Sequence, residues 1–221
     1  MKNMVELVTP RNRHRYQREL NQMFEMRYRA AMSMNWRLPE AVGEVDIDRF
    51  DRPDTVYVMD FDKDRNVIGC GRIIPTLGPT LLSEVFPEFC EVGVPSSPDI
   101  YEYSRCMIDS DRLDVRAFVR TRARINVAMN EYCLKVGIPK VAMLTYKRHY
   151  PLIIRNWKTR PLGLPRFCED DQATYVAVLS DMTTDGLRSL MKSQYVKEPV
   201  LECGDGLDPA VRHTLEFESV R

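Results

Sequence analysis

An alternation of short apolar runs with longer amphipathic segments constrains the fold of this chain most. The β-branched and aromatic runs 55–61 and 67–74 flank the turn sequence DKDRN, which predicts a β-hairpin. Later apolar runs are separated by segments of helical periodicity, so helix-linked strands follow the hairpin. We expect these strands at 99–109, 141–146 and 173–181, and helices at 12–34, 113–137, 148–157 and 183–195, with a short helix inside the proline-broken segment 75–89. This order predicts an α/β fold, a three-layer sandwich around a mixed sheet.

Size and charge narrow the function classes. The chain has 221 residues, which suits a single domain spanning 1–221. Its 32 basic and 32 acidic residues give a net charge of zero, which argues against a nucleic-acid-binding protein, because such proteins neutralise phosphates with excess positive charge. No run approaches the ~20 apolar residues that cross a bilayer, and the amino terminus lacks the apolar core of a signal peptide. We therefore expect a cytoplasmic protein.

Several common sites have no sequence support. The six cysteines form no CxxC pair, and the three histidines do not cluster with them, so neither a zinc site nor a disulfide framework is indicated. Glycine-rich GxGxxG and GxxxxGK[ST] loops are absent, as is a GxSxG nucleophile motif. The sequence therefore favours an enzyme or binding domain that depends on charged side chains.

An acidic loop at 36–52 carries Asp46, Asp48 and Asp51 within six residues. Three neighbouring carboxylates repel one another unless a positive group lies among them. One interpretation is a site for a cationic ligand or a clamp on an arginine. The other is a solvated turn whose aspartates cap backbone amides.

Charged residues also interrupt two apolar strands. Glu102 and Arg105 lie in YEYSRCMID, and Arg72 lies between two glycines in GCGRII. In a regular strand Glu102 shares a face with Ser104, while Arg105 points the other way; a bulge would change this. Buried charges must be paired, so these residues either form structural ion pairs or organise a reaction site with Glu102 as a base.

Two further features have both a structural and a functional interpretation. Arginines recur every fourth residue at 112, 116, 120 and 124 along the predicted long helix. This stripe is either a solvated face or a docking surface for an anionic partner. Trp36 lies in a polar loop, where its ring can stack on a planar or cationic ligand.

Together these residues resemble the LuxI-type acyl-homoserine-lactone synthases, over about Phe24 to Ser180. The resemblance rests on an ordered signature: Arg27, Trp36, Asp48-x-x-Asp51, Arg72, Phe86 before Pro87, and Glu102-x-x-Arg105. Thr145 and the Arg-x-Trp and Pro-Leu-Gly elements of LTYKRHYPLIIRNWKTRPLG are similar to the second half of the family. SEVFPEF and RPLGLP look closest to the branch that makes branched-chain or aryl lactones from acyl-coenzyme A. Ala31 stands where the family usually has an aromatic residue.

The resemblance implies an acetyltransferase (GNAT)-like fold and a quorum-sensing synthase. Such enzymes transfer an acyl group from acyl-CoA or acyl carrier protein to the amine of S-adenosylmethionine, close the lactone and release methylthioadenosine. S-adenosylmethionine is consumed as a substrate, and no cofactor, metal, nucleic acid or membrane span is expected.

The resemblance also assigns roles to residues. Glu102, Arg105 and Arg27 are the implied catalytic residues, with Glu102 deprotonating the amine through a water. Asp48 and Asp51 would serve the cationic sulfonium directly or by fixing Arg27 and the loop. Arg72 and Arg105 would hold the acidic loop against the sheet, and backbone amides at a strand bulge would stabilise the oxyanion. The implied substrate-binding residues are Trp36, Asp48, Asp51, Arg72, Phe86, Ser104 and Thr145, the last in the acyl pocket.

Two alternatives remain open at this point. A different GNAT-like N-acyltransferase would share the fold, although it normally has a Q/R-x-x-G-x-G/A loop that this sequence lacks. A non-catalytic relative that binds a ligand would retain the fold without turnover.

Overall fold

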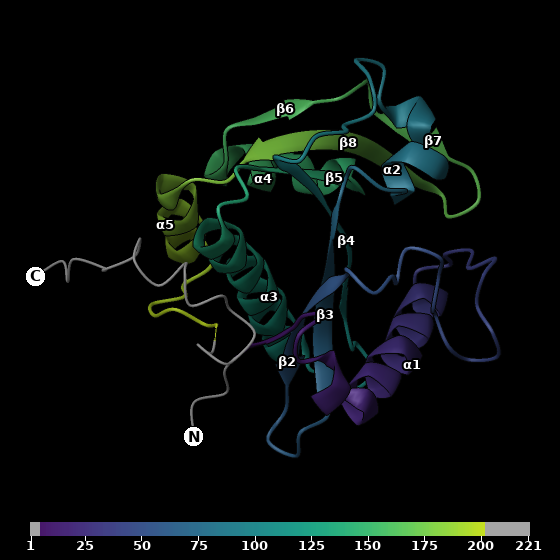
Figure 1. The fold of residues 1–221 in the computed structure, drawn as a ribbon, viewed down its shortest axis with the longest axis vertical. Coiled ribbons are helices and arrows are strands. Elements are labelled where there is room, and N and C mark those ends of the chain that lie inside the picture. Colours follow the sequence, from purple (N-terminus) through teal and green to yellow (C-terminus); the bar gives the residue numbers. More distant parts are fainter. Residues whose placement is uncertain (1–4, 202–221) are drawn as a thin grey trace, which may run out of the picture.

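The computed structural model describes residues 5–201, which form one eight-stranded mixed sheet with helices on both faces (Figure 1). The helices are α1 (Gln17–Ser33), α2 (Leu81–Glu84), α3 (Val115–Val136), α4 (Tyr150–Asn156) and α5 (Thr184–Ser193), with short 3₁₀ turns η1 (Arg13–Arg15), η2 (Pro87–Phe89) and η3 (Lys147–His149). The strands are β1 (Glu6–Val8), β2 (Val56–Phe61), β3 (Val67–Pro75), β4 (Ile100–Ile108), β5 (Lys140–Tyr146), β6 (Thr159–Pro161), β7 (Arg166–Cys168) and β8 (Ala173–Asp181). The three-layer α/β prediction is confirmed.

The sheet runs in the order β1-β2-β3-β4-β5-β8-β6, with β7 pairing to β8. All pairs are antiparallel except β4 and β5, which are parallel and hydrogen-bonded only over Ile100–Glu102. Beyond Glu102 these two strands separate, and β4 continues with β3 while β5 continues with β8. In Figure 1 the two halves of the sheet accordingly diverge. The divergence opens the interior of the molecule at the centre of the sheet.

Helices cover both faces of this divided sheet. α1 packs on one face against β3 and β4, whereas α3 packs on the opposite face against β2, β3 and β4 and against α5 (Figure 1). Alternation along β5 follows the same division, since Val141 and Met143 join the core under α3 while Ala142 joins the core under α2. Burial of these apolar faces holds the layers together.

Local signals explain where the helices begin and end. The Asp114 carboxylate accepts a 2.7 Å hydrogen bond from the Ala117 amide at the start of α3, and Gly137 ends the helix at φ 75°. Thr80 and Ser83 form a capping box on α2. The first helix begins at Gln17 and not at Asn12 as predicted, because residues 13–15 form a 3₁₀ turn and the Asn12 side chain bonds to the backbone of Leu7 and Thr9.

Two glycines on β3 lie under packed side chains. A Cβ atom on Gly69 would lie 2.7 Å from Cγ2 of Thr121 on α3, and one on Gly71 would lie 2.6 Å from the ring of Tyr103. The glycines thus permit close packing of a helix and an aromatic ring on the strand. A glycine inside a strand often marks the close approach of a ligand or of another part of the protein. Here the close neighbours are side chains of the protein itself.

Candidate active site

Arg27 is the centre of a buried ion-pair network that joins α1 to the acidic loop. Its guanidinium donates to Asp46 at 2.9 Å and to both carboxylate oxygens of Asp51, at 2.8 and 3.1 Å. The Arg27 side chain is fully buried, as is that of Asp51. A helix residue is thereby fixed to a loop about twenty residues further along the chain, in the two-point geometry that arginine makes with carboxylates.

Two strand arginines complete the network from the side of the sheet. Arg72 on β3 pairs with Asp48 and lies 3.2 Å from Asp51. Arg105 on β4 donates to Asp46 at 3.0 Å and to Asp48 at 2.8 Å. We call these six residues the arginine–aspartate network: Arg27, Asp46, Asp48, Asp51, Arg72 and Arg105. Three positive and three negative charges balance within it.

The arginines change the acidity of the loop carboxylates. Burial by itself would raise the pKa of Asp46, but the charges of Arg27 and Arg105 outweigh it and hold the pKa below its usual range. Arg27 and Arg72 likewise overcome the burial of Asp51 and lower its pKa. These aspartates are therefore ionised and neutralised by protein groups, so the loop is not a solvated turn. Amide capping, the other part of that interpretation, is present, because Asp51 accepts from the Asp48 amide at 3.0 Å and Asp48 from the Phe50 amide at 2.9 Å.

A bulge in β4 makes this arrangement possible. Met107 pairs with Cys70 and Ser104 pairs with Arg72, so Arg105 and Cys106 together oppose the single residue Gly71. Arg105 adopts the left-handed conformation, with φ 52°. The extra residue changes the alternation of side chains, and Arg105 thereby reaches the acidic loop.

Glu102 lies at the point where β4 and β5 separate. Its buried carboxylate accepts hydrogen bonds from the backbone amides of Leu81 at 3.1 Å and Leu82 at 2.8 Å. Burial raises the pKa of Glu102, and the two amide bonds and the nearby charge of Arg72 oppose that rise. The same carboxylate therefore fixes the start of α2 and faces the interior of the cleft.

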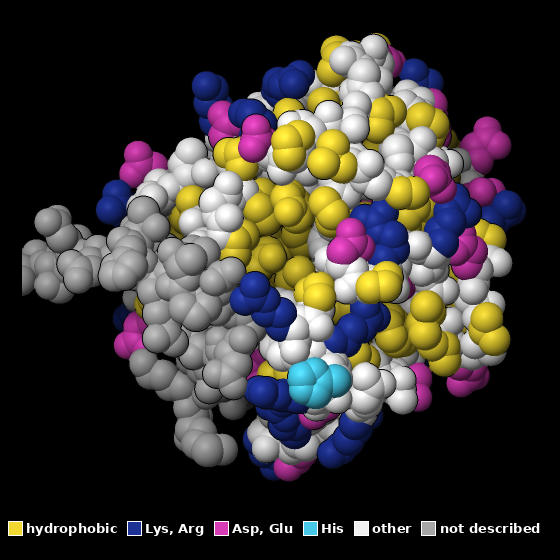
Figure 2. Space-filling view, in the orientation of Figure 1, with side chains coloured by type: hydrophobic (Ala, Val, Ile, Leu, Met, Phe, Trp, Pro, Cys, Tyr) yellow, Lys and Arg dark blue, Asp and Glu magenta, His cyan; other side chains and the backbone are white. Residues whose placement is uncertain are grey.

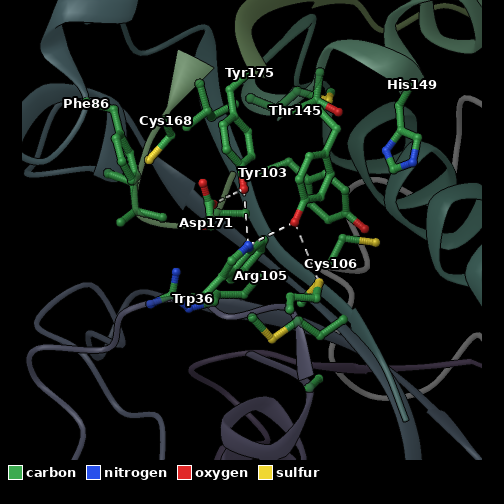
Figure 3. Close-up of a pocket in the computed structure, with 18 of the residues that line it drawn as sticks. Trp36, Phe86, Tyr103, Arg105, Cys106, Thr145, His149, Cys168, Asp171 and Tyr175 are labelled. Atoms are coloured by element: carbon green, nitrogen blue, oxygen red, sulfur yellow. Dashed lines mark hydrogen bonds between the residues drawn. The ribbon is translucent and has the colours of Figure 1, made fainter. Parts of the chain in front are cut away.

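A cavity of about 1080 Å³ occupies the gap between the two halves of the sheet. Figure 2 shows apolar side chains gathered around a hollow near the middle of this face, and Figure 3 shows residues of both halves converging on the cavity. Its wall includes six of the residues predicted from sequence: Trp36, Phe86, Glu102, Ser104, Arg105 and Thr145. Arg27, Asp48, Asp51 and Arg72 lie behind this wall; Asp48 contacts the wall residue Arg105, and Arg72 contacts the wall residue Ser104.

Tyr146, Asp171 and Tyr175 are among the cavity residues that were not assigned to a site by sequence reasoning. The indole nitrogen of Trp36 donates to the hydroxyl of Tyr146 at 2.9 Å and to that of Tyr175 at 3.1 Å. The two tyrosine rings stack with centroids 4.7 Å apart. Trp36 is separated from these tyrosines by more than a hundred residues, so no local pattern could have revealed the contact.

The arginine stripe of α3 does not form one continuous docking surface. Arg124 turns toward β2 and pairs with the buried Asp60 at 2.8 Å, while Arg116 and Arg120 are exposed. The part of α3 that faces the cavity carries Phe118, Arg122, Asn126 and Met129. The prediction of a four-arginine surface is corrected in this respect, because rotation along the helix brings Arg124 over the sheet.

The remaining sequence predictions concern cysteines, metals and membranes. Cys70, Cys90 and Cys133 are buried free thiols, as expected, whereas Cys106 and Cys168 are on the cavity wall; Cys203 lies outside the described residues. Within residues 5–201, no group of three or more potential ligand side chains is placed to hold a metal ion. In the same range, no helix is long and apolar enough to cross a membrane.

A mixed sheet that diverges around a cavity, with a glutamate at the point of divergence, defines an acyltransferase-like α/β fold. FeeM, an N-acyl amino acid synthase from uncultured soil microbes, shares this fold with a TM-score of 0.50 at 12% identity, over 86% of this chain and 97% of that one. Likeness at this identity establishes the fold alone.

Sequence comparison gives the family. The family model for autoinducer synthases matches residues 11–185. An isovaleryl-homoserine lactone synthase of Bradyrhizobium diazoefficiens is 31% identical over 215 residues, covering 96% of this chain and 95% of the relative. The crystal structure of BjaI, a CoA-dependent acyl-homoserine lactone synthase, with SAM and isopentyl-CoA matches with a TM-score of 0.78 at 30% identity, over 90% of this chain and 92% of that one. The chain belongs to the autoinducer synthase family, and it is an acyltransferase.

Proposed function

We propose that this chain, working as one domain over residues 1–221, joins an acyl group from acyl-CoA to the amine of S-adenosylmethionine and makes an acyl-homoserine lactone. The observation that carries the proposal is the cavity at the divergence of β4 and β5. Its wall includes Glu102 and also Arg105, which binds the acidic loop, and the chain belongs to the autoinducer synthase family. Acyl-CoA is proposed as the donor in preference to acyl carrier protein, since BjaI is described as CoA-dependent.

The first chemical step is acyl transfer. The ammonium of S-adenosylmethionine must lose a proton before its nitrogen can attack the thioester carbonyl. Glu102 accepts this proton through a water, and its burial-raised pKa strengthens it as a base. Backbone amides at the Arg105–Cys106 bulge stabilise the oxyanion of the tetrahedral intermediate. Collapse of that intermediate breaks the carbon–sulfur bond of the thioester and releases coenzyme A as its thiol, which takes the proton that the nitrogen loses as the amide forms.

The second step closes the ring. The methionine carboxylate attacks its own γ-carbon, the bond from that carbon to the sulfonium breaks, and methylthioadenosine leaves as a neutral thioether. Positioning dominates this intramolecular reaction. Arg27 and Arg72 act by holding the acidic loop rigid, while Arg105 joins that loop to the cavity wall.

The substrate-binding residues divide between the two halves of the sheet. Trp36, Phe86 and Ser104 bind S-adenosylmethionine on the side of α1 and α2. Thr145 shares the α3 side of β5 with Val141 and Met143, where the apolar side chains Phe118 and Met129 accommodate the acyl chain. Asp48 and Asp51 contribute through the arginines that they hold.

Product analysis tests the proposal. The purified protein is incubated with S-adenosylmethionine and a panel of branched, linear and aryl acyl-CoAs, and with the matching acyl carrier proteins. Methylthioadenosine and the acyl-homoserine lactone are then quantified by mass spectrometry. Equal amounts of both products from an acyl-CoA support the proposal. Acylation without lactone, or no turnover with any donor, overturns it.

A further inference from the structure

The sulfonium of S-adenosylmethionine needs a negative group that the arginine–aspartate network does not provide. Asp46 is held by two arginines, as are Asp48 and Asp51, and each of these carboxylates is within 3.2 Å of both of its partners. The network is neutral, and apart from Arg105 its members lie behind the cavity wall. A cation in the cavity therefore meets no uncompensated charge from this loop.

Asp171 supplies a carboxylate of the required kind. It lies in the turn between β7 and β8, on the cavity wall. One of its oxygens, Oδ2, accepts a hydrogen bond from the hydroxyl of Tyr175. The other oxygen, Oδ1, is buried and has no hydrogen-bond partner among the described residues. A buried carboxylate oxygen left without a partner is unfavourable by about 1–3 kcal/mol or more, so the negative charge of Asp171 is only partly compensated by the described residues.

Tyr175, which donates to this carboxylate, belongs to a group of three contacting aromatic rings. Trp36, Tyr146 and Tyr175 are tied together by the indole hydrogen bonds, and the Trp36 and Tyr146 rings lie 6.4 Å apart. Figure 3 shows Asp171 beside Tyr175, with Trp36 approaching both from the other half of the sheet. The hydroxyls of Tyr146 and Tyr175 both accept from the Trp36 indole, and these hydrogen bonds hold the three rings in place without a ligand.

The chemistry of a sulfonium matches this combination. A sulfonium has a full positive charge but no hydrogen to donate, so ordinary acceptors such as carbonyl groups recognise it poorly. Aromatic faces attract such cations through the ring quadrupole, as they attract quaternary ammonium groups. A nearby carboxylate adds direct Coulomb attraction.

We propose that Asp171, with Trp36, Tyr146 and Tyr175, binds the sulfonium of S-adenosylmethionine. This inference rests on the proposed function and adds a substrate-binding residue from the carboxyl-terminal half of the sheet. It also explains why methylthioadenosine would dissociate after the reaction, because ring closure removes the positive charge that Asp171 attracts.

Comparison of two ligands tests the assignment. Asp171→Asn keeps the size of the side chain and removes its charge. Its dissociation constants for S-adenosylmethionine and for methylthioadenosine, which lacks the sulfonium, are measured by calorimetry. We expect the dissociation constant for S-adenosylmethionine to rise about tenfold or more and that for methylthioadenosine to stay unchanged. Tyr175→Phe, which keeps the ring but frees Oδ2, should give a smaller loss with the same selectivity.

Asp185→Asn is the matched control, because Asp185 is an exposed carboxylate on α5 that is not part of the cavity wall. It should bind both ligands as the unmodified protein does. Equal weakening of both ligands by Asp171→Asn, or no weakening of either, overturns the inference while the product assay still supports the synthase. If the unmodified protein does not bind S-adenosylmethionine, the proposed function fails together with the inference.

Discussion

Replacing Arg27 with methionine should destabilise the protein more than any exposed ion pair could. The side chain is fully buried, and it donates three hydrogen bonds to two carboxylates. Without it Asp46 keeps Arg105 and Asp51 keeps Arg72, but the network has a net buried charge of −1. Loss of one partner from a buried ion pair typically costs about 3–5 kcal/mol, a large part of the ~5–15 kcal/mol that keeps a domain folded.

The decisive measurement is urea unfolding of Arg27→Met near neutral pH and at about pH 5.5. In the unmodified protein the pKa values of Asp46 and Asp51 are lowered, so the stability that they contribute is present above their unfolded values and is lost only as the pH falls through the folded ones. In the variant, Asp46 and Asp51 each keep one arginine instead of two, so burial is less opposed and the pKa of these carboxylates rises relative to the unmodified protein. Protonation then relieves the buried charge, and the deficit relative to the unmodified protein should shrink at the lower pH.

Charge compensation provides a second check on the same reasoning. The double variant Arg27→Met/Asp51→Asn restores a neutral network and should be more stable than Arg27→Met alone. Arg188→Gln is the control, because Arg188 and Asp185 form an exposed pair on α5 that should contribute less than about 1 kcal/mol. A loss below about 1 kcal/mol for Arg27→Met, with no dependence on pH and no rescue by the second substitution, would refute the electrostatic argument.

Three further predictions concern turnover, donor binding and packing. Glu102→Gln should lower kcat by about 10²-fold or more with the fold intact, on general-base magnitudes; near-normal turnover would remove Glu102 from the role of base. Charge reversal at the exposed Arg116 and Arg120 should raise KM for acyl-CoA and leave KM for S-adenosylmethionine alone in steady-state assays, whereas equal effects on both would mean a structural role. Gly69→Ala should reduce the free energy of unfolding by about 1–3 kcal/mol, because its Cβ meets Thr121, and adding Thr121→Ser should recover part of that loss; additive losses in urea unfolding would contradict the steric explanation.

The long elements of the fold were predictable because their signals are local. The apolar runs that became β2, β3, β5 and β8 and the capped helix α3 were all identified from sequence. β1 and β7 were missed, since three residues carry no periodicity and these strands exist only by pairing with β2 and β8.

The candidate site divides in the same way. The types and order of Glu102, Arg105 and Trp36 made them candidates for a site, because charges inside apolar strands and an aromatic ring in a polar loop are unusual wherever they occur, and all three lie on the cavity wall. Their partners were not predictable. The pairing of Arg105 with Asp46 depends on a one-residue bulge, and the bond from Trp36 to Tyr175 joins residues 139 positions apart.

The sequence by itself determined which residues are charged, where the longer strands and helices lie, and which family the ordered signature resembles, since each of these follows from side-chain chemistry and short-range periodicity. Only the tertiary structure decided that the three loop aspartates are neutralised by arginines while Asp171 keeps an oxygen without a partner. Charge compensation is a property of distances between atoms, and those distances are set when the two halves of the sheet diverge around the cavity.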